Sequence, residues 1–219
     1  MDLLPVFVLP WGLTFHLRNE HDFKGNRQSE IHVNEQDRLD IDAAKNGNHE
    51  AYRRLVERYE ADISRLMYRF SQNDLICEEL VQEVFVEAYF SLDSYKFKAP
   101  FIFWLKTIAS RVGYRLWKRN AKQRKHVNLD DTDEMEAPTE PGLEHDDLLN
   151  TVHRLLDQLS PVDRLVLTLM YFDKCSLREI GQRMGWSTPV VKTRAYRARK
   201  RMQAIAERDN IWEEIEWAD

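Results

Sequence analysis

Apolar residues recur at helical spacing over two long stretches of the chain, from about residue 37 to 121 and from 148 to 205, and this pattern constrains the fold most. Between them, residues 127–147 combine acids with Pro138, Pro141 and Gly142 and carry almost no periodic apolar residues, which is typical of a linker. Residues 46–48 break the first stretch, and Ser160 followed by Pro161 begins a new helix in the second. The sequence contains no strand-like alternation and no internal repeat. We therefore predict an all-α fold: two helical domains joined by an acidic, flexible linker.

The predicted division is an N-terminal extension at 1–36, a first domain at 37–126, the linker at 127–147, a second domain at 148–205 and an acidic tail at 206–219. Residues 3–17 are apolar, but they follow an acid and contain two prolines, so we expect no signal peptide. No apolar run reaches about 18 residues, so no membrane span is expected. Cys77 and Cys175 lie in apolar patterns, which indicates buried thiols and a cytoplasmic protein.

Residues 176–201 read as two short helices around a tight turn. Ser176 and Glu179 have the spacing of a capping box, and Gly185 can end the first helix in the left-handed conformation. Thr188 is a candidate N-cap for the second helix, with Pro189 at its first position. The pattern predicts a helix-turn-helix whose second helix suits a DNA major groove.

Charge is segregated along the chain although the formal net charge is −5. Residues 192–201 hold six Lys or Arg and no acid, and residues 106–125 hold eight, whereas residues 130–147 hold nine acids and no Lys or Arg. The net charge therefore does not exclude nucleic acid as a partner. A basic helix can also be only a solvated face, and the capping and turn signals favour DNA binding over that alternative.

A second candidate nucleic-acid surface combines a loop at 94–100 with the predicted helix from Phe101 to Ala121. Aromatic side chains alternate with cations here, which suits stacking of unpaired bases together with contacts to the backbone. We expect Phe101 and Trp104 to be core residues. The outward face is predicted to carry Phe103, Thr107, Ser110, Tyr114 and Trp117, with Lys106, Arg111 and Lys118 beside them.

The predicted helix from Asp74 to Leu92 places acids opposite an apolar stripe, which indicates either a solvated face or a surface for a basic partner. No histidine lies three residues after a glutamate, so the carboxylates do not match a di-iron bundle and no metal is expected. No phosphate loop, nucleophile elbow or zinc-protease motif is present. We expect no catalytic residue, no cofactor and no enzymatic activity.

Four segments together resemble the extracytoplasmic-function (ECF) group of bacterial sigma factors in the sigma-70 family. They are ELVQEVFVEAY from Glu79, FIFWLKTIASR from Phe101, LSPVDRLVLTLMYFDKCSLREIG from Leu159 and VVKTRAYRARKRM from Val190. The resemblance spans about residues 38–204. It implies a non-catalytic subunit that binds core RNA polymerase, recognises double-stranded and melted promoter DNA, and is held in check by an anti-sigma factor or another regulator.

The resemblance also implies roles for individual residues. Those implied to bind polymerase are Glu79, Leu80, Gln82, Glu83 and Phe85. Those implied to contact the minus-10 element are Tyr95, Lys96, Phe97, Lys98, Lys106, Ser110, Arg111, Tyr114, Arg115 and Lys118. Those implied to contact the minus-35 element are Ser176, Arg178, Thr188, Val190, Lys192, Thr193, Arg194, Tyr196, Arg197 and Lys200.

Two other classes remain as alternatives. A stand-alone helix-turn-helix regulator would explain residues 176–201 but would leave the aromatic surface and the acidic helix without a role. An RNA-binding protein would use the aromatic side chains but not the two-domain arrangement.

Overall fold

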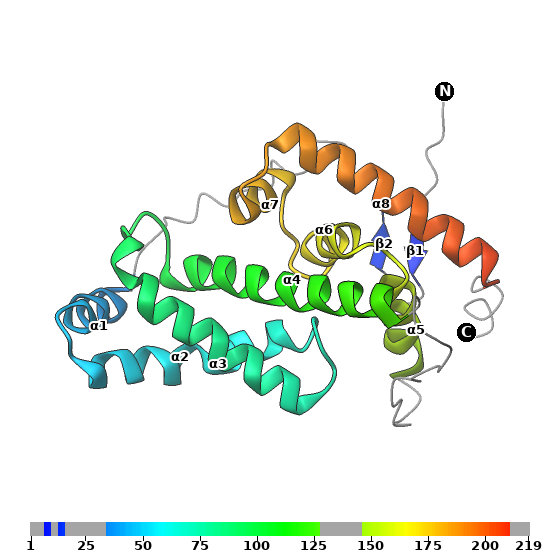
Figure 1. Ribbon diagram of the computed structural model, residues 1–219. Helices are drawn as coiled ribbons and strands as arrows, with labels where there is room; N and C mark the ends of the chain where they lie inside the picture. The colour runs from blue at the N-terminus through cyan, green and yellow to red at the C-terminus, as the bar shows by residue number, and fades with distance from the viewer. Residues whose placement is uncertain (1–6, 10–12, 16–33, 128–145, 211–219) are drawn as a thin grey trace.

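The computed structural model describes residues 7–9, 13–15, 34–127 and 146–210, and the side chains of 34–124 and 151–210. Over these residues the chain forms eight α-helices, one 3-10 turn and one pair of very short strands (Figure 1). The all-α prediction is confirmed for the body of the chain. None of the described helices is long and apolar enough to cross a membrane.

The first half of the chain contains α1 (Glu35–Lys45), α2 (His49–Met67), α3 (Asp74–Ser91), the turn η2 (Leu92–Ser94) and α4 (Phe101–Val127). An asparagine caps each of the first three helices: the side chains of Asn34, Asn48 and Asn73 accept hydrogen bonds from main-chain N–H groups of the first turn. These caps explain why the helices begin where they do. The break predicted at 46–48 separates α1 from α2.

The second half contains α5 (Asp146–Asp157), α6 (Pro161–Tyr171), α7 (Leu177–Met184) and α8 (Thr188–Arg208). Ser160 caps α6, its hydroxyl accepting from the N–H of Asp163, and Pro161 occupies the first turn as predicted. The end of α4 and the start of α5 each enter the predicted linker, and the rest of it, residues 128–145, lies outside the described residues. The predicted acidic tail begins within the last turn of α8, and residues 211–219 also lie outside them.

The N-terminal extension contains an antiparallel pair, β1 (Phe7–Leu9) and β2 (Leu13–Phe15), in which Phe7 is opposite Phe15. The sequence analysis did not predict these strands. Each is only three residues long, which is too short for an alternating pattern to stand out from the surrounding apolar residues.

Helix α4 lies at the centre of the molecule, with α2 and α3 on one side and α6 and α7 on the other (Figure 1). One buried apolar cluster spans both halves of the chain. It joins Leu105 and Val112 of α4 to Leu165, Ile180 and Val191 of the second half. The two halves are therefore packed against each other in addition to being joined by the linker. Both cysteines are buried, as predicted.

A charged network holds α1 against α2. The carboxylates of Asp37 and Asp40 are each about 1% exposed, and Asp40 accepts hydrogen bonds from Arg54 at 2.6 Å and from Arg58 at 2.7 Å. Arg58 also pairs with Asp37 at 2.5 Å. Burial acts to raise the pKa of Asp40, but the hydrogen bonds from the two guanidinium groups outweigh it, so the pKa lies below its usual value.

Candidate nucleic-acid interface

Helices α7 and α8 form the predicted helix-turn-helix. The Ser176 hydroxyl accepts from the N–H of Glu179 at 3.2 Å, and the Glu179 carboxylate accepts from the N–H of Ser176 at 2.7 Å, which completes the capping box. Gly185 ends α7 with φ of 70°. At Gly181 a Cβ atom would lie 2.6 Å from the main-chain oxygen of Trp186, so a side chain here would disrupt the turn.

The start of α8 differs from the prediction by one residue. Ser187 is the N-cap, without a side-chain hydrogen bond, and Thr188 and Pro189 occupy the first turn of the helix. The sequence analysis placed the cap at Thr188. Both residues are good caps, and proline is accepted at either of the first two helical positions, so the local pattern cannot separate the two registers.

Val191, Ala195 and Ala198 form the buried side of α8. The polar and cationic side chains of the helix therefore lie on its outward face. The predicted minus-35 residues Thr188, Val190, Lys192, Thr193, Tyr196, Arg197 and Lys200 are all exposed. Two cations rest on aromatic rings: Arg194 lies 4.5 Å from the centre of Trp186, and Lys200 lies 5.2 Å from the centre of Tyr196. This face has the shape and charge that a major groove requires.

Two other predicted minus-35 residues lie on α7 or at its cap. Arg178 is exposed, whereas the Ser176 hydroxyl is engaged in the capping box and donates to Glu179. Ser176 therefore orients the helix, and its hydroxyl is not free to contact DNA in this arrangement.

The acidic face of α3 is divided by burial. Glu79 and Gln82 are exposed, while Leu80 and Phe85 are 2% and 7% exposed and form part of the core. Leu80 and Phe85 therefore help to pack α3 in this structure, and their implied contact with polymerase stays a prediction. Glu83 and Glu87 both pair with Arg115 of α4, at 2.8 Å in the case of Glu83.

Arg115 was predicted to face DNA, and the structure instead pairs it with α3. Burial acts to lower the pKa of Arg115, but its hydrogen bonds to Glu83 and Glu87 raise the pKa on balance. The pairing sets the single charge of Arg115 against two carboxylates of α3, so one negative charge remains at this site. It leaves Glu79 as the exposed acid among the predicted polymerase contacts.

The loop before α4 is organised around Tyr95. Its ring is 3% exposed, its hydroxyl donates to the main-chain oxygen of Ala99 at 2.5 Å, and its own main-chain oxygen accepts from Lys45 Nζ at 2.9 Å. Tyr95 therefore supports the loop from within, and its implied contact with the minus-10 element stays a prediction. Lys96 and Lys98 are exposed.

Phe97 lies at the tip of the same loop with φ of 56°, a backbone conformation that is uncommon outside glycine. Its ring is half-buried between two cations of α1, with Arg38 at 5.4 Å and Lys45 at 5.0 Å from the ring centre. The cations of α1 thus hold an aromatic side chain near the surface, where an unpaired base could stack.

The cationic face of α4 is covered in part by α7. Arg111 Nε donates to the main-chain oxygen of Arg183 at 2.9 Å, and the Tyr114 ring meets the Trp186 ring edge-on at 6.4 Å. Lys118 lies 5.7 Å from the centre of the Tyr114 ring. Lys106 is half-buried, and burial lowers its pKa. These predicted minus-10 residues are gathered on one face, and that face is partly an internal contact here: Lys106 and Tyr114 are half-buried, whereas Arg111 and Lys118 are exposed.

Two side chains predicted to point outward from α4 are buried instead. Ser110 is fully buried with its hydroxyl donating to the main-chain oxygen of Lys106 at 2.7 Å, and Trp117 is 4% exposed with Nε1 donating to the oxygen of Phe70 at 2.9 Å. The outward assignment is wrong for both, because α4 is covered on two sides and a single apolar stripe does not describe it.

Comparison with known proteins finds two family regions in the chain. The family model described as Sigma-70 region 2 matches residues 55–123, and the one described as Sigma-70, region 4 matches residues 149–202. The ECF RNA polymerase sigma factor SigW of Bacillus subtilis is 28% identical over 173 residues, which cover 74% of this chain and 92% of that protein. The chain belongs to the ECF group of the sigma-70 family.

Other relatives of this sigma factor are similarly distant. The ECF sigma-E factor of Escherichia coli K12 is 27% identical over 182 residues, covering 75% of this chain and 91% of that protein. Among solved structures, CnrH in complex with the cytosolic domain of CnrY is 23% identical, covers 80% of this chain and 99% of that chain, and has a TM-score of 0.55. The latter likeness shows a shared fold.

The function follows from the family: the protein is an RNA polymerase sigma factor, which binds core polymerase and promoter DNA, and sigma factors are not enzymes. A stand-alone regulator is not favoured, because region 2 and region 4 are both present. The region 2 match covers most of α2, all of α3 and most of α4, and the region 4 match covers α6, α7 and most of α5 and α8.

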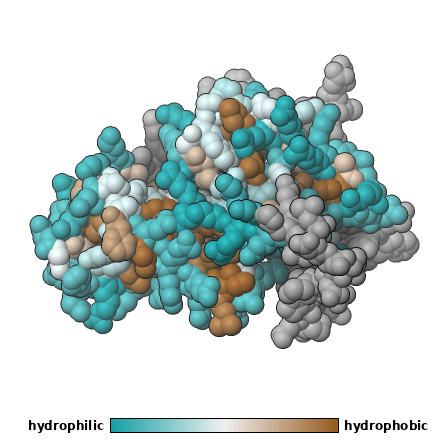
Figure 2. Space-filling view, in the orientation of Figure 1, coloured by the Kyte–Doolittle hydropathy of each residue, from teal (hydrophilic) through white to brown (hydrophobic). Residues whose placement is uncertain are grey.

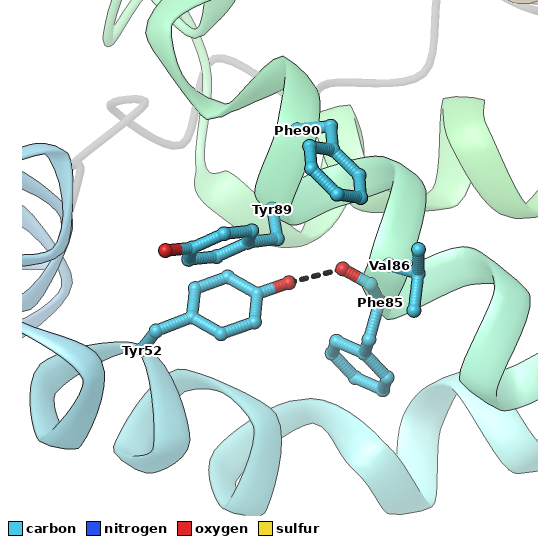
Figure 3. A pocket seen from close by; sticks show the side chains of 5 residues that line it. All are labelled: Tyr52, Phe85, Val86, Tyr89 and Phe90. Atoms are coloured by element: carbon cyan, nitrogen blue, oxygen red, sulfur yellow. Dashed lines mark hydrogen bonds between the residues drawn. The ribbon is translucent and has the colours of Figure 1, made fainter. Parts of the chain in front are cut away.

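The sequence analysis missed an apolar groove on α2 and α3. Tyr52, Phe85, Val86, Tyr89 and Phe90 line a cavity of about 310 Å³, and the Tyr52 hydroxyl donates to the main-chain oxygen of Phe85 at 2.5 Å (Figure 3). Phe90 is 82% exposed. In Figure 2, hydrophobic patches interrupt an otherwise hydrophilic surface. The sequence does contain one indication of this groove, because Val86 and Phe90 are apolar but lie outside the buried apolar stripe of α3.

Proposed function

We propose that this sigma factor uses residues 37–126 to bind core polymerase and melt the minus-10 element, and residues 148–205 to read the minus-35 element. On α3, Glu79 and Gln82 offer an exposed acidic and polar surface to a basic partner, and the groove beside Phe90 adds apolar area. On α8, Thr193, Arg197 and Lys200 face the major groove. The chain contributes binding surfaces and catalyses no reaction. It acts where polymerase acts, in the cytoplasm.

The observation that carries this proposal is the pair of faces that α3 and α8 leave exposed. One is acidic with apolar neighbours, and the other is cationic with no acid among its ten residues from 192 to 201. A protein that bound only duplex DNA would have no use for the first face. Binding polymerase through the acidic face and DNA through the cationic face at the same time explains why one chain contains both faces.

We further propose that the packed arrangement is a resting form. Recognition of the minus-10 element requires the face around Lys106, Arg111 and Tyr114. Helix α7 and the turn after it cover part of that face. Core polymerase would favour an open form because only that form exposes both DNA-binding faces at their required separation. In solved structures, CnrH is in complex with the cytosolic domain of CnrY, and the sigma factor RpoE of Bartonella quintana is in complex with the anti-sigma factor NepR. An anti-sigma factor of this chain would stabilise the closed form.

Transcription by purified core polymerase on a promoter library tests the function. We expect specific transcripts that depend on the added chain, and Glu79→Lys should abolish polymerase binding in a pull-down assay. Glu60→Lys, which reverses an exposed acid on α2, is the matched control and should bind normally. Polymerase that initiates equally well with and without the chain, at every promoter, would overturn the proposal.

A further inference from the structure

A cleft at the junction of the two halves has no role in the function described above. Its volume is about 510 Å³, and its walls come from the turn between α2 and α3, the C-terminal part of α4, and the junction between α5 and α6. We call it the junction cleft. Small-molecule sites in proteins commonly measure about 300–1,000 Å³. None of the residues lining the junction cleft belongs to the predicted polymerase or DNA contacts.

Three guanidinium groups line the junction cleft, those of Arg69, Arg124 and Arg164. The Arg164 side chain is only 13% exposed, and its guanidinium lies 4.1 Å from the centre of the Trp117 ring. It pairs with Asp157, but among the described residues its buried Nε atom has no hydrogen-bond partner. A buried cation with an unpaired donor is costly, and a negative charge in the junction cleft would stabilise the Arg164 cation.

The local charge balance favours an anion. Asp157 is the one carboxylate among the residues that line the junction cleft, and it pairs with Arg164, while Arg69 pairs with Asp173 outside the lining. Three guanidinium groups therefore meet two carboxylates, which leaves one positive charge in excess. Burial, with help from the charge of Arg124, lowers the pKa of Arg164 to about 10, so Arg164 remains charged at neutral pH. Burial and the charge of Arg164 lower the pKa of His153, which favours its neutral form. The repulsion between Arg124 and Arg164 would be relieved by a negative group between them.

We propose that the junction cleft binds a small ligand with phosphate groups, held by Arg124 and Arg164. The planar guanidinium fork donates two parallel hydrogen bonds to a phosphate, which gives arginine an advantage over lysine at such sites. Because Arg164 is nearly buried, a duplex backbone does not reach it and a small anion does. Inorganic polyphosphates and nucleoside polyphosphates share this chemistry.

Such a ligand would touch both halves of the chain at once. It would stabilise their packing by an amount that grows with the logarithm of ligand concentration. The bound ligand would thereby oppose separation of the two halves for promoter recognition. This consequence rests on the proposed function, whereas ligand binding itself does not.

Calorimetric titration of the full chain with pyrophosphate, and separately with ATP and GTP, at constant ionic strength tests the proposal. We expect saturable binding of one ligand per chain. Binding of pyrophosphate itself would identify the phosphate groups as sufficient, and binding of nucleotides alone would show that the base contributes. No saturable binding of any of the three at millimolar concentration would overturn the proposal.

Two variants assign the binding to the junction cleft. Arg124→Ala should weaken binding at least tenfold, while Lys122→Ala, which removes an exposed charge from the same helix outside the cleft, should change it less than twofold. Ala121→Phe fills the cleft without changing charge and should also weaken binding. Equal losses in Arg124→Ala and Lys122→Ala, or full binding by Ala121→Phe, would contradict the assignment. Thermal unfolding midpoints equal to that of the parent chain establish that the variants are folded.

Discussion

Arg111 of α4 donates a hydrogen bond from Nε to the main-chain oxygen of Arg183 at the end of α7, 2.9 Å away and 72 residues along the chain. The contact between Tyr114 and Trp186 lies beside it. A cation predicted to meet the minus-10 element is therefore used to join the two halves. The packing of the two halves and recognition of the minus-10 element therefore compete for the same side chains.

Trp186→Ala should favour the open form. The substitution removes the ring that meets Tyr114 and supports Arg194, so the packing between α4 and the second half should weaken by about 1–3 kcal/mol. Hydrogen exchange should rise in residues 105–118 of α4. Tyr196→Ala is the control, because this exposed ring lies on the outward face of α8. Unchanged exchange in Trp186→Ala would mean that the contact does not hold the halves together.

Arg197→Ala should weaken binding to minus-35 duplex DNA by about 1–3 kcal/mol if the guanidinium contacts a base edge, with reduced sequence selectivity. Fluorescence anisotropy against cognate and scrambled duplexes measures both quantities. Arg208→Ala, at the far end of the same helix, should leave them unchanged. An equal loss on every duplex would assign Arg197 to the phosphate backbone.

Asp40→Asn should destabilise the fold by about 1–3 kcal/mol at pH 7, because it removes the charged acceptor from Arg54 and Arg58. The folded pKa of Asp40 lies below its unfolded value, so its contribution is fully present above the unfolded pKa of about 4 and is lost as pH falls through the folded pKa. Urea unfolding between pH 7 and pH 2.5 should show a smaller loss of stability in Asp40→Asn than in the parent. An equal loss of unfolding free energy in Asp40→Asn and in the parent over this pH range would contradict the predicted direction.

Lys45→Met should impair recognition of melted minus-10 DNA while leaving duplex minus-35 binding intact. Lys45 donates to the Tyr95 main-chain oxygen and lies over the Phe97 ring, so its loss should loosen the loop at 94–100. Binding of a single-stranded minus-10 oligonucleotide to the complex with core polymerase measures the effect, with a loss of about tenfold or 1.4 kcal/mol expected. Arg53→Met, on the exposed face of α2, is the control. A matching loss of minus-35 binding would indicate general unfolding.

Local interactions made several features predictable from sequence. The capping box at Ser176, the left-handed Gly185 and the cap at Ser160 depend on residues within one turn of each other, and all appear as expected. Val191, Ala195 and Ala198 recur at helical spacing, and they form the buried side of α8 because this helix packs through one face only. The helical periods likewise identified the all-α fold.

The positions of Tyr95, Ser110 and Trp117 depended on neighbours distant in sequence. Ser110 and Trp117 were assigned to the surface from the helical period of their segment, and Tyr95 from its place in the loop before it. All three are buried because α4 is packed on two sides and the preceding loop folds back toward α1. The junction cleft and the contact between Arg111 and Arg183 likewise exist only where separate helices meet. The sequence by itself determined the helices, their caps and the family, since these rest on short-range spacing. Which charged and aromatic faces remain open was decided only by the tertiary packing, because burial depends on every element that surrounds a side chain.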